Sequence, residues 1–93
     1  MEFIEIEGRL QRLLTQFGTD LPPEQIDNMK GLVEAGEPGV ALEDYCTQLF
    51  EYDISVPAPV VAELEELGRA MGIDEKHWTR LRQQPLGLGE SQT

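Results

Sequence analysis

The sequence has 93 residues, of which 18 are acidic and 7 are basic, so its formal net charge is −11. A chain of this length forms one domain with a single small core. Nucleic acids and anionic membranes are polyanions, so such an acidic surface argues against direct binding to either and favours a cationic partner. Acidity can also serve solubility alone, and composition leaves that alternative open.

The single cysteine, Cys46, excludes a disulfide within the chain, so the fold does not depend on an oxidising compartment. Residues 1–7 carry acids where a secretory signal peptide needs a basic start and a long apolar run. No stretch approaches the ~20 apolar residues of a membrane span. We therefore expect a cytoplasmic protein that does not enter the membrane.

Two helices are predicted in the first part of the chain from apolar residues that recur at three- and four-residue spacing. The first runs from about residue 3 to residue 17, and its apolar face comprises Phe3, Ile6, Leu10, Leu13, Leu14 and Phe17. Pro22 and Pro23 open the second helix, and Gly36 ends it.

The third predicted helix, about residues 40–52, is amphipathic. One face carries Leu42, Tyr45, Cys46 and Leu49. The opposite face, which we expect to face water, carries Glu43, Asp44, Thr47, Gln48 and Glu51.

The fourth predicted helix, about residues 59–71, has Gly68 on its inward face, which predicts the close approach of another helix. On its outer face, Glu65 and Arg69 are expected to pair across one turn. A short last helix is expected to follow, with Asp74 as its N-cap and Trp78 packed on the residue before the cap, Ile73.

We therefore expect residues 1–84 to form a single all-α domain, a small antiparallel bundle of four to five short helices. Residues 85–93 contain Pro85, Gly87 and Gly89 without apolar periodicity, and are expected to form a flexible C-terminal tail.

The residues that carry chemistry predict a protein that is not an enzyme and that holds no metal or cofactor. His77 is the only histidine and has no second histidine or cysteine near it in sequence, which argues against a metal centre or a catalytic triad. Cys46 lies on an apolar face with acids nearby, where a small buried hydrophobic residue is the usual role. Carboxylates on an open helix face lack the burial that general acid catalysis requires.

Charge is segregated along the sequence. No basic residue occurs between Lys30 and Arg69, and that stretch holds nine acids, whereas Arg69 to Arg82 holds four basic and two acidic residues. Solubility does not require such segregation, so the pattern favours recognition of a basic surface over simple solvation.

The central sequence LVEAGEPGVALE at residues 32–43, followed by Cys46, Leu49, Phe50, Glu51 and Tyr52, resembles the MafI family of immunity proteins. The later residues Leu64, Leu67, Met71-Gly72-Ile73-Asp74, Trp78 and Leu81 are similar to the second half of that family. The resemblance covers most of residues 20–82. It implies a cytoplasmic protein that binds and silences the toxin domain encoded beside it, and such toxins are commonly nucleases with basic grooves. It implies no catalytic residues.

Charge and resemblance together predict a partner-binding surface for a cognate toxin domain with a basic surface. It comprises Glu34, Glu37, Glu43, Asp44, Glu51, Tyr52 and Asp53, with Tyr52 as an aromatic anchor at its margin. If the third helix is not the interface, Glu63 and Glu66 on the fourth helix are the next candidates. The alternative is a small regulatory or scaffold module that binds a partner helix or peptide in an apolar groove lined by Trp78, Tyr45 and Tyr52.

Overall fold

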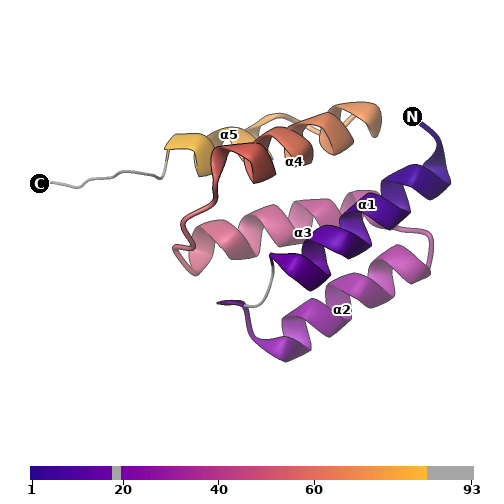
Figure 1. Ribbon diagram of the computed structural model, residues 1–93, viewed down its shortest axis with the longest axis horizontal. Helices are drawn as coiled ribbons and strands as arrows, with labels where there is room; N and C mark the ends of the chain where they lie inside the picture. Colours follow the sequence, from indigo (N-terminus) through magenta and orange to yellow (C-terminus); the bar gives the residue numbers. More distant parts are fainter. Residues whose placement is uncertain (18–19, 84–93) are drawn as a thin grey trace, which may run out of the picture.

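The computed structural model describes residues 1–17 and 20–83, and Figure 1 shows their arrangement. The five helices are α1 (Phe3–Gln16), α2 (Pro23–Glu34), α3 (Pro38–Glu51), α4 (Ala58–Ala70) and α5 (Lys76–Gln83). No strand occurs in these residues, which confirms the all-α prediction. The first four helices begin and end within two residues of the expected bounds. The predicted tail, 85–93, lies outside the described residues.

Helix α3 lies in the middle of the fold and contacts each of the other four helices (Figure 1). Consecutive helices run in opposite directions, with α2 on one side of α3 and the α4–α5 pair on the other. Helix α5 runs parallel to α3. The contacts show this, since His77 lies beside Glu43 and Arg80, further along α5, lies beside Thr47, further along α3. This central position decides how much of α3 remains open to solvent.

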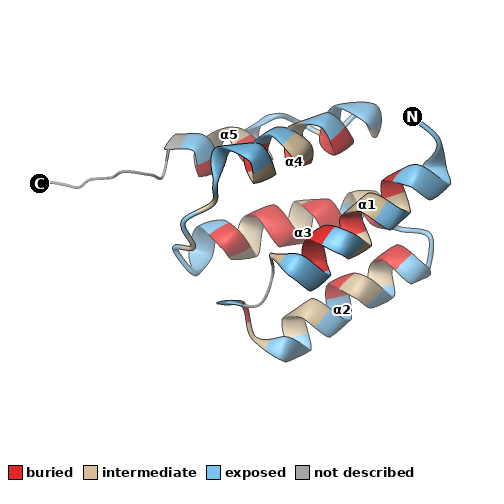
Figure 2. Ribbon diagram, in the orientation of Figure 1, coloured by how far each residue is buried: buried red, intermediate tan, exposed pale blue. Residues whose placement is uncertain are grey.

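The core is formed by apolar side chains from all five helices, with the buried positions drawn in red in Figure 2. Its largest fully buried members are Trp78, Tyr45, Leu10, Leu14, Met29, Leu42, Leu49, Leu64, Leu67 and Leu81. No charged side chain is buried in the described part of the chain. The prediction that Phe3 joins this core is wrong, because the first turn of α1 lies at the edge of the fold and leaves Phe3 54% exposed.

Glycines end α2 and α4 as the sequence predicts. Gly36 has a φ of 84° and Gly72 a φ of 72°, the left-handed region that a side chain disfavours. Beyond Gly36, the N–H of Glu37 donates to the carbonyl of Leu32 at 2.9 Å, the hydrogen bond that closes a Schellman motif. The tight turn that follows leads directly into α3.

Helices α4 and α5 pack closely through Gly68, which confirms the predicted close approach and identifies its partner. A Cβ atom on Gly68 would overlap the indole of Trp78, with Cη2 only 2.6 Å away. At the start of α5, the backbone N–H of Lys76 donates to Asp74 Oδ1 at 2.9 Å, as expected for an N-cap. The cap and the close contact together fix the position of α5 against α4 and α3.

Candidate functional site

Two carboxylates of α4, Glu63 and Glu66, form ion pairs with one arginine from α1. Arg9 Nε lies 3.2 Å from Glu63 Oε2, and Arg9 Nη2 lies 2.9 Å from Glu66 Oε1. A third carboxylate, that of Glu5, lies 3.6 Å from Nη1 of the same guanidinium. The hydrogen bond from Arg9 lowers the pKa of Glu66, and the bond to Glu66 in turn raises the pKa of Arg9. The acids named as second candidates for the interface are therefore engaged within the fold.

We expect the variant Arg9→Met to lose stability in a pH-dependent way. Because the folded-state pKa of Glu66 is below its ordinary value of 4.5, the Arg9 contact stabilises the fold above that pH and is lost as pH falls through the lowered pKa. Urea unfolding at pH 7, 5, 4 and 3 should give a parent midpoint above that of the variant at pH 7. The gap between the two midpoints should narrow as the pH falls below 4.5, and a gap that stays constant down to pH 3 would contradict the assignment.

Glu65, the third acid of α4, is held by two other arginines. Arg69 Nη2 lies 2.7 Å from Glu65 Oε2, which confirms the predicted pair across one turn. Arg82 of α5 approaches the other oxygen at 2.9 Å, and its hydrogen bond, followed by that of Arg69, lowers the pKa of Glu65. All three acids of α4 therefore have arginine partners.

The acids of the predicted partner-binding surface differ from those of α4 in this respect. Within residues 1–17 and 20–83, no Lys or Arg forms an ion pair with Glu34, Glu37, Asp44 or Glu51. In the same part of the chain, the ion-pair partner of Glu43 is a histidine, with 3.9 Å between Glu43 Oε2 and His77 Nε2. These four acids of the predicted partner-binding surface therefore carry negative charge that no ion pair with Lys or Arg of the described residues balances.

The structure does not gather the seven predicted residues into one compact patch. Glu34 and Glu37 lie at the turn between α2 and α3, whereas Glu51, Tyr52 and Asp53 lie at the opposite end of α3. At 1.5 Å per residue along a helix, the two groups are separated by roughly 20 Å. They mark the two ends of the central helix.

The outer face of α3 is less open to water than the sequence predicts. Glu51 is exposed and the Glu43 side chain keeps 47% of its surface open. Asp44, Thr47 and Gln48 are partly buried because α5 and α2 cover the two flanks. On one flank, Arg80 Nη2 donates to Thr47 Oγ1 at 3.1 Å. On the other, Gln48 Nε2 donates to Gln25 Oε1 at 2.7 Å. The part of the outer face of α3 that remains open to solvent is therefore a narrow strip.

Helix α5 also brings positive charge close to α3, which the sequence analysis missed. The Arg80 guanidinium lies over the ring of Phe50, with 4.6 Å from Cζ to the ring centroid. Segregation of charge along the sequence is therefore only partly segregation in space. The spacing of His77 and Arg80 in the sequence could have indicated this contact, because it places both side chains on one face of a helix.

The aromatic residues separate into buried and exposed groups. Tyr45 and Trp78 are 0% and 1% exposed, so the groove that these residues were expected to line is not formed by them. Tyr52 is 50% exposed at the end of α3, and Phe50, two residues before it in sequence, is 39% exposed. Tyr52 is thus accessible to a partner, as an anchor must be.

Cys46 is fully buried, and burial raises the pKa of its thiol to about 12. A thiol in this state is a poor nucleophile because the thiolate is the reactive form. In the folded protein we expect Ellman's reagent to label Cys46 at least 100-fold more slowly than in 6 M guanidinium chloride. Comparable rates in the two solvents would show that the thiol is accessible.

Neither a metal centre nor a membrane span emerges from the described residues. In residues 1–17 and 20–83, no group of three or more His, Cys, Asp or Glu side chains is arranged to hold a metal ion. None of the helices in this part of the chain is both long and apolar enough to cross a bilayer.

Comparison with models of protein families, with curated proteins and with solved structures gives no match.

Proposed function

We propose that this chain is a non-catalytic immunity protein that binds and neutralises a cognate bacterial toxin domain, a nuclease with a basic surface, through the acids around α3. The observation that carries the proposal is the contrast in ion pairing between helices. The acids of α4 are engaged by Arg9, Arg69 and Arg82, whereas those at residues 34, 37, 44 and 51 pair with no Lys or Arg of the described chain. Unpaired carboxylates retain their charge and hydrogen-bonding capacity for a cationic partner.

The dimensions of α3 suit such an interface. A standard protein–protein interface buries roughly 800 Å² on each partner, a patch about 30 Å across. The two acidic ends of α3, roughly 20 Å apart, fit within one patch of that size. A toxin groove that runs along α3 would meet both ends, with Tyr52 at the margin.

The regulatory or scaffold alternative has less support. An apolar groove for a helix requires several exposed apolar side chains in a row, and Tyr45 and Trp78 are buried. Charge is therefore the better basis for recognition by α3.

The proposal is tested with the toxin domain encoded beside the gene for this chain. Replacing Glu37 by Gln, Asp44 by Asn and Glu51 by Gln removes three unpaired charges without changing side-chain size. We expect association at low salt to slow by about 10-fold or more and the salt dependence of the association rate to become shallower. Stopped-flow measurements at 50 and 300 mM NaCl report both quantities.

The matched control removes three acids that lie outside residues 34–53, with Glu2, Glu7 and Glu90 each replaced by Gln. It changes the net charge by the same amount, so it isolates position from total charge. Equal slowing in the two triple variants would show that only net charge matters. An unchanged rate in the first variant would exclude the α3 surface, and the absence of any binding to the encoded neighbour would overturn the proposed function.

A further inference from the structure

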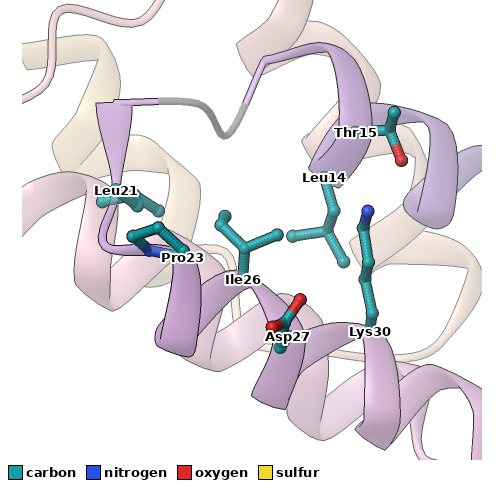
Figure 3. A pocket seen from close by; sticks show the side chains of 7 residues that line it. All are labelled: Leu14, Thr15, Leu21, Pro23, Ile26, Asp27 and Lys30. Carbon is teal, nitrogen blue, oxygen red and sulfur yellow. The ribbon is translucent and has the colours of Figure 1, made fainter.

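A pocket of about 280 Å³ lies between the end of α1 and the first half of α2 (Figure 3). Its floor is apolar and consists of Leu14, Leu21, Pro23 and Ile26. Its polar lining comes from Thr15 at the end of α1 and from Asp27 and Lys30 on α2, all labelled in Figure 3. None of the seven residues predicted for partner binding contributes to it.

The size of the pocket restricts what it can hold. Sites for drug-sized ligands and cofactors occupy about 300–1,000 Å³. A pocket at or below the lower limit of that range suits one large side chain or a small fragment, and an apolar floor suits a hydrocarbon or aromatic group. A single protruding residue of a partner protein fits these dimensions.

The charge around the pocket indicates which side chains would flank the partner residue that enters it. Asp27 lines the pocket, and the exposed Asp20 and Glu24 adjoin the lining residues Leu21 and Pro23 in sequence. None of these three acids forms an ion pair with a Lys or Arg in the described ranges, and Lys30 is the only base in the lining. Positive charge beside the incoming side chain would therefore be favoured.

One helix, α2, separates the pocket from the acidic end of α3. Ile26 follows Gln25 directly, and Gln25 accepts the 2.7 Å hydrogen bond from Gln48 in the second half of α3. Glu51 lies one turn beyond Gln48 on the same helix, and Tyr52 follows directly after the last residue of α3. The first half of α2 thus lies between the pocket on one side and the C-terminal half of α3 on the other.

We propose that this pocket receives one large apolar or aromatic side chain, flanked by Lys or Arg, from the surface of a partner protein. It is the apolar anchor that complements the carboxylates of α3, and in identifying the partner as the toxin domain it rests on the proposed function. Anchors of this kind carry most of the binding energy at interfaces because they are fully desolvated in a preformed pocket. The surrounding acids then contribute to association rate and selectivity.

The pocket is tested with short peptides, without any toxin. The probe is acetyl-Lys-Phe-Lys-amide, and the comparison peptides replace Phe by Ser or both Lys residues by Glu. In methyl-resolved NMR titrations, we expect the probe to bind with a millimolar Kd and to shift the signals of Leu14, Leu21 and Ile26. Binding of each comparison peptide should be at least 10-fold weaker.

A pair of charge reversals locates the site. Asp27→Lys places a base at the pocket, whereas Glu2→Lys makes the same change in charge just before α1, at the other end of that helix from the pocket. The first variant should weaken probe binding by at least 5-fold, and the second by less than 2-fold, with unchanged circular dichroism in both.

Equal binding of the Ser peptide, equal effects of the two variants, or shifts away from the three methyl groups would each overturn the pocket proposal. Because these titrations contain no toxin, such a failure leaves the salt-dependence test of the α3 acids unaffected. The opposite result is also possible, in which the pocket binds the probe but replacing the α3 acids does not change toxin binding. That result would support the pocket proposal and contradict the proposed function.

Discussion

Replacing Gly68 by alanine is expected to lower the free energy of unfolding by about 3 kcal/mol, since a methyl group there requires the Trp78 ring to move. The ring is 1% exposed and enclosed by α3, α4 and α5, so it has little room to shift. Chemical denaturation followed by tryptophan fluorescence measures the loss and reports on the same ring.

Two other glycines provide matched controls for Gly68→Ala. Gly8 in α1 and Gly31 in α2 are exposed and have open space where a Cβ would be added, so alanine at either should raise stability by about 0.5–1 kcal/mol. In a Trp78→Leu background, which removes the obstructing ring, Gly68→Ala should cost at least 1 kcal/mol less than in the parent. A similar cost in both backgrounds would show that Trp78 does not cause the effect.

Truncation of core leucines is expected to have an equally large effect. Leu49 of α3 and Leu64 of α4 are both 0% exposed, and alanine at either should cost about 2–5 kcal/mol because it removes apolar contacts and leaves a cavity. Val40, also on α3 but 48% exposed, is the control, and Val40→Ala should change stability by about 0.5 kcal/mol or less. Urea unfolding monitored by circular dichroism separates the two outcomes. Equal losses at Leu49 and Val40 would contradict the burial assigned to α3.

Local signals in the sequence were sufficient to locate the helices. Pro23 and Pro38 stand at the first positions of α2 and α3, and Gly36 and Gly72 adopt the left-handed conformation just beyond α2 and α4. These signals act within a few residues of one another, so they are visible without knowledge of the fold. Gly68 was also found in this way, although its partner, Trp78, was not.

Features that depend on which helices become neighbours were not predictable from local patterns. Arg9 lies more than 50 residues from Glu63 and Glu66 in sequence, and nothing near either acid indicates this contact. The apolar periodicity of α1 includes Phe3, but periodicity cannot show where the covering helices end. Whether a residue at a helix terminus is buried depends on how far the neighbouring helices extend.

The candidate site shows the same division. The absence of basic residues around positions 34–53 is a sequence property. Among the residues that the structure describes, Glu37, Asp44 and Glu51 form no ion pair with Lys or Arg, which agrees with it. The direction in which each side chain points depends on α2 and α5, whose contacts with Gln48 and Thr47 narrow the open strip of α3. The pocket beside Ile26 depends on the packing of α1 against α2, which no motif records.

If α3 is the binding surface proposed above, its central position limits how binding preference can diverge without loss of the fold. A substitution at Thr47 or Gln48 also disturbs a contact with α5 or α2. Val40 and Glu51 are exposed, so replacements there change what the surface presents at little structural cost. New specificities should therefore arise first at the two ends of α3, and changes in the middle should require a compensating change on a neighbouring helix.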